Sequence, residues 1–438
     1  MSDARESIFR FRGRLRDMAP DVKRMLVDRA TARDAAVQSG VASIISRVEK
    51  DGDVALRELA RQYDGVELTS IEVTPGEMSK AVASIRPGLM RAMQRSAANI
   101  EAVHRAQLPL ATVVEVEPGI VVGRRPDPLQ RVGVYAPGGR AAYPSSVLMG
   151  AIPARVAGVA EVILCSPPGV DGLPSASVLA AAHIARVNRV FAVGGAGAIA
   201  AMCMGTHTIP RVDKVVGPGN AFVAEAKLQL AGFAAFDSPA GPSELLVIAD
   251  AAATPEVIAR EVIAQAEHDP RAIVVVVVVG DAAVALIEGA IASAVLSAKR
   301  NEIVLESLNA RGAVVVVDSL DEAVALANDF APEHLMIATE RPEELLPAIR
   351  NAGTVFLGET SSVTFGDYLT GANHVLPTGG LARSYSGLST LDFIRWTTYQ
   401  SIDVSGAAAL AADVGEFAEA EGLYAHAAAA RGWMESPR

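Results

Sequence analysis

Runs of aliphatic and β-branched residues alternate with alanine-rich runs through the middle of the chain. A first series follows residue 131 and reads VAEVILCSPPG, SASVLAAAHIARV, RVFAVGGAG, AIAAMCMG and KVVGPGN. A second series begins with ELLVIAD at 244–250 and continues with a helix near 255–268, the strand AIVVVVVV, a helix near 281–298 and the strand AVVVVDS. This rhythm predicts parallel sheets covered by helices. We therefore expect an α/β fold with two such units in series.

The two ends of the chain depart from this rhythm. Residues 28–106 show the periodicity of amphipathic helices, and strand-like pieces, VVEVEPGIVVGRR and RVGVYAPGG, follow from Val113. Past about residue 386 we expect the strands to stop and an alanine-rich helical tail to follow. Such a tail packs either on its own subunit or on a partner, and the pattern leaves both open.

Composition and charge limit the kinds of partner. The chain has 438 residues, more than one hydrophobic core usually organises, so we expect two domains. A net charge of -11 at pH 7 argues against a nucleic-acid surface, which needs a basic patch, and favours a small-molecule partner. The most apolar run, 272–279, is far shorter than the ~20 residues of a membrane span, so we expect no membrane segment.

The amino terminus and the cysteines indicate the compartment. The sequence MSDARESIFRFRGRLRD is broken by charges and lacks the apolar region and cleavage site of a secretory signal. We therefore expect a cytoplasmic protein. The two cysteines, Cys165 and Cys203, lack the spacing of a disulfide framework or of a cysteine-based zinc site, so we expect both to be core residues.

Two glycine-rich turns are candidates for binding a nucleotide. Gly195, Gly197 and Ala200 follow the apolar run RVFAV with the spacing of a dinucleotide fingerprint, in which glycines let the backbone approach a pyrophosphate. The turn Gly217-Pro-Gly-Asn220 opens a second helix with free N–H groups. The first turn suits an ordinary strand-to-helix connection equally well. For the second, a plain Gly-Pro turn with Asn220 as a helix cap is the preferred interpretation from the pattern alone.

Two pairs of polar residues are candidates for metal or acid–base chemistry. Gln265 and His268 lie three residues apart near a helix end, hence on one helical face, where both could bind one ion. Glutamine is a rare zinc ligand, so from these residues alone a helix end stopped by Pro270 is the preferred interpretation. Glu333 and His334 offer a carboxylate and an imidazole side by side, and the alternative is a surface pair.

Further candidates lie near the carboxyl terminus. Asp367 and His374 fall in TFGDYLTGANHVLPTGG, a loop that concentrates Asp, Asn, His and Tyr and is therefore a candidate binding loop. Glu421 and His426 lie five residues apart on the predicted tail, which is not a same-face spacing, so by themselves they read as solvated residues. The remaining histidines are expected to be structural: His104, His183 and His207.

Seven segments together resemble the histidinol dehydrogenase family. In chain order they are VGVYAPGG, VGPGNAFVAEAK, SPAGPSELLVIAD, AQAEHDP, APEHL, FGDYLTGANHVLPT and EGLYAH. Seven such matches in the family's order, spread over most of the chain, are not a coincidence.

The resemblance implies a role for each residue that matches the family's pattern. It implies a zinc site formed by Gln265, His268, Asp367 and His426. It implies that Glu333 and His334 are the catalytic pair. The implied substrate contacts are Ser243, Gln265, His268, His334, Asp367, His374, Glu421 and His426. The implied NAD contacts are Tyr135, Gly197 and Asn220, with the departure that Gly197 replaces a glutamine common in the family and removes its side-chain contact.

The resemblance also implies an architecture. Two Rossmann-like parallel-sheet domains with helical extensions at both termini form an intertwined homodimer, and the tail of each subunit reaches the other's active site. On this division residues 1–27 form an N-terminal arm. A first α/β domain with the metal and catalytic residues comprises 28–130 and 244–385, the cofactor domain comprises 131–243, and the tail that crosses to the partner comprises 386–438.

The implied activity is the NAD-dependent oxidation of L-histidinol through L-histidinal to L-histidine, with two NAD reduced. An alternative is a relative that oxidises another small polyol or a sulfonated alcohol. His374 and Glu421 argue against it because they suit the imidazole and amino groups of histidinol. A binding protein without turnover would be expected to lack Glu333, His334 or a metal ligand, and all are present.

Overall fold

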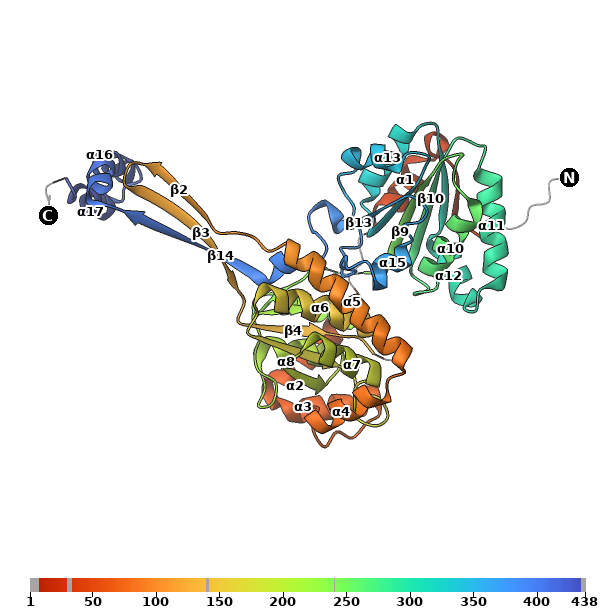
Figure 1. Cartoon of the computed structure of the whole chain (residues 1–438), viewed down its shortest axis with the longest axis horizontal. Coiled ribbons are helices and arrows are strands. Elements are labelled where there is room, and N and C mark those ends of the chain that lie inside the picture. The colour runs from red at the N-terminus through yellow and green to blue at the C-terminus, as the bar shows by residue number, and fades with distance from the viewer. Residues whose placement is uncertain (1–7, 30–33, 139–141, 240, 435–438) are drawn as a thin grey trace.

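The computed structural model describes residues 8–29, 34–138, 142–239 and 241–434. These residues form two α/β domains and a long arm that extends away from both, with the last two helices at its far end (Figure 1). Both domains contain a parallel sheet, which confirms the α/β fold class. None of the helices in the described ranges has the length and apolarity needed to cross a membrane.

The first domain is built on a six-stranded parallel sheet with the order β1-β11-β10-β9-β12-β13. Its strands are β1 (Phe11–Arg14), β9 (Glu244–Ala249), β10 (Ile273–Val279), β11 (Ala313–Val317), β12 (His334–Ala338) and β13 (Thr354–Leu357). Its helices are α1 (Pro20–Val27), α10 (Pro255–Ala266), α11 (Val284–Ser297), α12 (Asn301–Arg311), α13 (Leu320–Phe330), α14 (Pro342–Leu345) and α15 (Val363–Tyr368). The unbroken valine run of β10 reflects burial on both faces: Val276 packs into one hydrophobic cluster, and its neighbours Val275 and Val277 pack into the opposite one.

The predicted N-terminal arm, residues 1–27, is part of this domain in its described portion. Strand β1 pairs in parallel with β11 and so provides hydrogen-bond partners for backbone groups of β11 that would otherwise be unpaired. Leu26 of α1 is buried in the same core cluster as Leu326 and Phe330 of α13. The prediction of a separate arm is therefore wrong for residues 8–27.

The second domain is built on a five-stranded parallel sheet with the order β6-β5-β4-β7-β8. Its strands are β4 (Arg131–Tyr135), β5 (Glu161–Ser166), β6 (Arg189–Ala192), β7 (Lys214–Val216) and β8 (Ala235–Phe236). The helices between and after these strands are α6 (Pro144–Ala157), α7 (Ala176–Ala185), α8 (Gly195–Met204) and α9 (Ala221–Gln229). Both cysteines are buried in one of its two core clusters, as expected.

The helical segment before this sheet packs on the second domain rather than the first. Its helices are α2 (Ala35–Asp51), α3 (Asp53–Leu59), α4 (Pro75–Ser84) and α5 (Pro87–Ala106), with a π-helical turn at Ala60–Asp64. Val41 and Ile44 of α2 share a core cluster with Ile199 of α8, and Ile100 of α5 shares one with Ile152 of α6. The assignment of 28–130 to the first domain is therefore wrong for these helices, because their apolar faces match the helices of the second sheet.

The arm is a three-stranded antiparallel sheet that carries two helices. Its strands are β2 (Thr112–Glu117), β3 (Ile120–Pro128) and β14 (Ile394–Ile402), and its helices are α16 (Val404–Ala420) and α17 (Tyr424–Arg431). The expectation that strands stop past residue 386 is wrong, since β14 pairs with β3 along its whole length. The sequence IRWTTYQSI is rich in β-branched and aromatic residues, which favour such a strand. Single turns of 3₁₀-helix complete the described fold at Leu15–Asp17, Leu346–Ala348, Leu381–Arg383 and Thr390–Phe393.

Candidate active site

The two parallel sheets share one strand order. If β1 at the edge of the first sheet is left out and the strands of each sheet are numbered in chain order, both sheets have the order 3-2-1-4-5. The order therefore reverses between β9 and β12 in the first domain and between β4 and β7 in the second. Ligands of open α/β sheets usually bind beside such a point at the carboxyl ends of the strands. In the first domain the candidate residues lie at the opposite edge: Glu333 precedes β12, His334 begins it, and Glu244 begins β9 beside them.

Glu333 and His334 form a buried pair on the backbone of Glu244. The Glu333 carboxylate accepts a hydrogen bond of 2.8 Å from the Glu244 N–H, and His334 donates from Nδ1 to the Glu244 carbonyl oxygen at 3.0 Å. The imidazole Nδ1 and the Glu333 carboxylate are 3.5 Å apart. Because Nδ1 bonds a carbonyl it carries the proton, so Nε2 is the free basic atom of the neutral ring. The alternative of a surface pair is therefore wrong.

The surroundings of this pair shift both pKa values toward the neutral and alkaline range. Burial raises the pKa of Glu333 to about 7. Burial acts to lower the pKa of His334, but the nearby carboxylates of Glu333 and Asp367 outweigh it and raise this pKa to about 9. A carboxylate and an imidazole with such values can exchange protons with a bound molecule near physiological pH.

Asp367 and His374 lie on the far side of His334. Asp367, on α15, has its carboxylate 3.6 Å from His334 Nε2, and its main-chain carbonyl accepts a 2.8 Å hydrogen bond from His374 Nδ1. Burial lowers the pKa of His374, which favours the neutral ring. His334, Asp367 and His374 line one small cavity together with Phe356. The structure thus brings the predicted loop residues beside the acid–base pair.

Gln265 lies near the end of α10, and His268, just past that end, interacts electrostatically with Asp367 and His334. Gln265 is only 2% exposed, and its Nε2 has no hydrogen-bond partner within the described residues. His268 follows the helix end and remains open to solvent on one side. Removal from water on its other side lowers the pKa of His268, and the attraction of the nearby Asp367 carboxylate opposes this. The helix does end here. A helix end alone does not explain why the buried amide nitrogen of Gln265 has no hydrogen-bond partner among the described residues.

The donor atoms near this cavity suit a metal ion only in part. Gln265, His268 and Asp367 supply an amide, an imidazole and a carboxylate, which suit zinc or a similar divalent ion. No three His, Cys, Asp or Glu side chains are grouped to hold a metal ion within the ranges that the structure describes. The missing partner of the buried Gln265 amide is nevertheless what an absent ligand would leave. The set therefore fits a metal ion that takes a further ligand from elsewhere.

Two predicted site residues do not reach this cavity within one chain. Glu421 ends α16 and His426 lies in α17, and both are exposed. Figure 1 shows these helices at the far end of the arm, away from the domain that contains β13 and α15. The expectation that both act in the same site as His334 therefore requires a second subunit.

The predicted cofactor residues gather at the carboxyl edge of the second sheet. Tyr135 ends β4 and is 3% exposed, and its hydroxyl accepts a 3.0 Å hydrogen bond from the Gly195 N–H. Burial raises the pKa of Tyr135 to about 12. Asn220 is exposed and caps α9, because its Oδ1 accepts from the N–H groups of Phe222 and Val223. Tyr135 thus shapes the glycine turn, and Asn220 leaves its amide nitrogen at the helix N-terminus.

Gly197 occupies a different position from the one expected of a cofactor contact. It is buried inside α8, and a Cβ added to it would lie 3.0 Å from a methyl carbon of Leu59 on α3. The missing side chain therefore serves close helix packing, and the structure does not expose this position to a ligand. At the neighbouring turn, Gly217 has a φ of +121°, and a Cβ there would collide with the Tyr135 carbonyl oxygen.

Comparisons with known proteins identify the family. The family profile described as histidinol dehydrogenase matches residues 27–432. Histidinol dehydrogenase from Methanothermobacter thermautotrophicus is 48% identical over 92% of this chain and 94% of its own length. That of Halobacterium salinarum is 48% identical over 94% of this chain and 96% of its own length. A crystal structure of histidinol dehydrogenase from Elizabethkingia anophelis covers 98% of each chain with a TM-score of 0.93 and 34% identity.

The chain belongs to the histidinol dehydrogenase family. It is accordingly an oxidoreductase of histidine biosynthesis that acts on a small molecule. The relatives support this function and not the alternative of another polyol or a sulfonated alcohol.

Some residues around the site of this histidinol dehydrogenase family member were missed from the sequence. Arg29 and Glu244 form a buried ion pair beside Glu333 and His334. Ser96 and Asn99 of α5 donate 2.6 Å hydrogen bonds to the carbonyls of Tyr368 and Leu369, next to Asp367. Each of these is a polar residue near apolar residues of a helix or strand. A polar residue at a position where the pattern predicts burial is the signal that could have identified them. Ser243, which was predicted, lies half-buried directly before Glu244.

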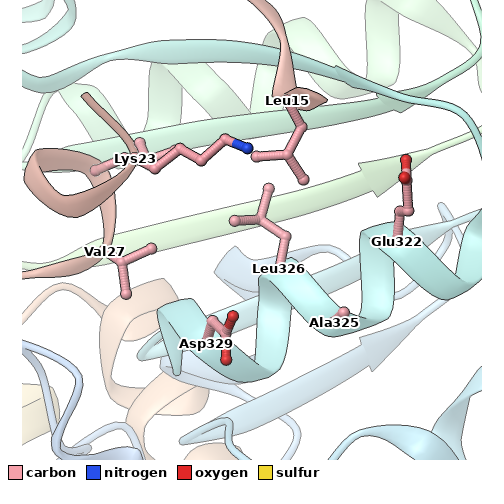
Figure 2. Close-up of a pocket in the computed structure, with 8 residues that line it drawn as sticks. Leu15, Lys23, Val27, Glu322, Ala325, Leu326 and Asp329 are labelled. Atoms are coloured by element: carbon pink, nitrogen blue, oxygen red, sulfur yellow. The ribbon is translucent and has the colours of Figure 1, made fainter. Parts of the chain in front are cut away.

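A second hollow is lined by other residues of the first domain. Figure 2 shows it between α1 and α13, with Leu15, Leu326 and Val27 around it and Lys23 at one side. Glu322 and Asp329 lie at its rim. None of the candidate site residues lines it, so the smaller cavity at His334 remains the candidate site.

Proposed function

We propose that this enzyme oxidises L-histidinol through L-histidinal to L-histidine, with His334 and Glu333 as its acid–base residues. One observation carries the proposal: among the residues that the structure describes, the buried His334 Nε2 has no hydrogen-bond partner, while Nδ1 donates to a carbonyl. A buried, unpaired nitrogen costs free energy unless a ligand satisfies it. The hydroxyl of a bound alcohol would supply that partner.

Gln265, His268 and Asp367 would hold a zinc ion together with His426 of the partner subunit. Zinc has no redox chemistry, so its contribution when bound is to fix the substrate in place through nitrogen ligands. The free amide of Gln265 and the neutral form favoured for His268 support this assignment. His374 and Ser243 complete the substrate contacts, with Glu421 of the partner subunit beside the amino group.

His334 takes the hydroxyl proton at Nε2 while the carbinol carbon loses hydride. NAD, when bound, accepts one hydride in each of the two oxidations. Glu333 then takes a proton from water as the water oxygen adds to the aldehyde carbon, and protonated His334 returns its proton to the carbonyl oxygen to give the hydrate. The neutral His334 takes a hydroxyl proton from the hydrate as the second hydride leaves, and the acid that forms releases its remaining proton to become the carboxylate. Because the pKa of His334 is raised to about 9, the neutral ring that accepts the hydroxyl proton gains population as the pH rises toward the mildly alkaline range, where Glu333, with a pKa of about 7, is ionised.

NAD is proposed to bind at the carboxyl edge of the second sheet. The turn between Tyr135 and Gly195 and the N-terminus of α9 at Asn220 offer backbone N–H groups to a pyrophosphate. Because Gly197 faces α3, we assign cofactor binding to the backbone, to Asn220 and to the turn that Tyr135 supports.

A homodimer with shared active sites explains the arm. Its sheet exposes apolar residues that a lone subunit would leave in water, including Val113 and Val114. Phe365 and Tyr368, which flank Asp367, are each 56% exposed. We infer that the arm and tail of one subunit cover these surfaces on the other. The two buried, unpaired cysteines fit a reducing compartment, so we place the enzyme in the cytoplasm.

Initial rates of NAD reduction with different alcohols test the substrate assignment. L-histidinol, a sulfonated alcohol and a simple polyol are compared at equal concentration with the zinc-loaded enzyme. We expect turnover of L-histidinol and none of the other two. Faster oxidation of either competitor would overturn the assignment and leave the acid–base roles to be judged by substitution of His334.

A further inference from the structure

A second ionic pair lies directly behind the acid–base residues. The side chains of Arg29 and Glu244 are 2% and 1% exposed. Arg29 donates from Nε and Nη2 to the two carboxylate oxygens of Glu244, at 2.8 Å and 2.9 Å. Such a two-point contact fixes both the distance and the plane of the two groups.

The remaining contacts of this pair tie four segments together. Arg29 donates to the carbonyls of Val27 and Phe330 at 2.9 Å and 2.8 Å, and its guanidinium lies 3.4 Å from the centre of the Phe330 ring. Glu244 also accepts a 2.9 Å hydrogen bond from the N–H of Gly379. The end of α1, the start of β9, the end of α13 and the loop after His374 therefore meet at this ion pair.

The backbone of Glu244 connects this pair to the chemistry. Its N–H donates to Glu333, and its carbonyl accepts from His334 Nδ1. A shift or rotation of this one residue would move the carboxylate and the imidazole together and would release the proton on Nδ1. A buried ion pair is seldom more stabilising than apolar residues of the same size, so stability alone does not account for it.

We propose that Arg29 and the Glu244 side chain are positioning residues that hold the Glu244 backbone, and through it Glu333 and His334, in register with the substrate. The inference rests on the proposed roles of Glu333 and His334. Arg29 touches neither substrate nor cofactor and acts only through Glu244. Because misplacement by about 1 Å can lower a rate on the order of 100-fold, loss of the pair should lower kcat more than it changes KM.

Two variants separate positioning from stability. In Arg29→Met/Glu244→Met both charges are removed, so no buried charge is left unpaired. The Gly379 N–H and the Val27 and Phe330 carbonyls lose a partner, so the melting temperature should fall moderately while the protein still folds. We expect kcat for L-histidinol to fall at least tenfold, with the KM values for L-histidinol and NAD within threefold and zinc content unchanged. Arg29→Lys keeps the charge but loses the two-point contact, and it should show an intermediate kcat.

The matched control is Arg189→Met. Arg189 also makes a two-point contact with a glutamate, Glu72, at 2.8 Å for both bonds, and lies over a phenylalanine ring, but it is on the second domain away from His334. Its kcat should equal that of the parent. The inference is overturned if the double variant keeps the parent kcat. If the double variant does not fold, a parent kcat in Arg29→Lys overturns it. His334→Gln in the same assay tests the underlying roles: parent activity there would overturn the proposed function instead.

Discussion

His334 Nδ1 lies 3.0 Å from the carbonyl oxygen of Glu244, so the imidazole is held by the backbone of the neighbouring strand. The partner is a carbonyl, which can only accept, and the proton therefore resides on Nδ1. Nε2 then points with its lone pair into the cavity that Asp367 and His374 line. This single contact fixes which nitrogen acts as the base.

Replacement of His334 by glutamine should remove that base. Glutamine retains hydrogen-bonding capacity and similar length but cannot take a proton. We expect kcat with L-histidinol to fall roughly 100- to 10,000-fold, while zinc content and melting temperature stay near the parent values. Steady-state NADH formation and metal analysis on the same preparation measure both. A variant with the parent rate would refute the role of His334.

Replacement of Glu333 by glutamine should affect the second oxidation most. Water addition to the aldehyde needs a base, whereas the first oxidation relies on His334. We expect oxidation of supplied L-histidinal to fall on the order of 100-fold or more, with a smaller loss for the alcohol step in single-turnover experiments. Equal losses in both steps would show that Glu333 does not act selectively on the hydrate.

The pH dependence of aldehyde oxidation should follow Glu333. Burial raises its pKa to about 7, and only the ionised carboxylate can accept a proton from water. As the pH falls below about 7, a growing fraction of Glu333 is protonated, and the rate of L-histidinal oxidation should fall with it. The same profile measured on Glu333→Gln should lose this acidic limb. Persistence of the limb in the variant would assign it to another group.

A subunit carrying His426→Ala and one carrying Glu333→Gln should complement each other. Either homodimer has two damaged sites. In a mixed dimer the first subunit's Glu333, His334 and domain ligands would meet an intact His426 of the partner subunit, which restores one site. We expect activity in the mixture after unfolding and refolding together, measured against each homodimer treated alike. No gain above the two homodimers would contradict donation of His426 across the dimer.

Loss of Asn99 should weaken metal binding. Its amide donates 2.6 Å to the Leu369 carbonyl and so holds the turn that follows Asp367. Contacts that orient metal ligands are typically worth about 10- to 100-fold in affinity, so Asn99→Leu should release zinc to a chelator at correspondingly lower chelator concentrations. Ser79→Ala, which removes an exposed hydrogen bond on α4, is the control and should leave chelator sensitivity unchanged.

The hydrophobic pattern predicts the two parallel sheets because strands such as β10 are apolar at every position, a signature of burial on both faces. The pattern does not predict which sheet a helix covers. Helices α2 and α5 precede the second sheet and pack on it, since the complementary apolar faces of Ile199 and Ile152 are there. Strand β14 was missed because it is flanked by alanine-rich helix and pairs with β3, far away in sequence.

The candidate site was predictable in its residues but not in its arrangement. Spacing on a helix relates Gln265 to His268, but nothing local relates either of them to Asp367, which comes from α15. The burial of Glu333 and His334 depends on β9, and the Arg29–Glu244 pair joins residues far apart in the chain. Gly197 showed the converse: its spacing suggested a cofactor contact, and its packing against Leu59 explains it instead.

The stoichiometry of NADH to L-histidine tests the central claim most directly. The zinc-loaded enzyme is given a limiting amount of L-histidinol with excess NAD, and both products are counted, with and without a chelator. A four-electron oxidation at one site predicts two NADH for every L-histidine, no free aldehyde, and loss of both products after chelation. One NADH for each L-histidinol consumed, with L-histidinal released and no L-histidine formed, would contradict the account.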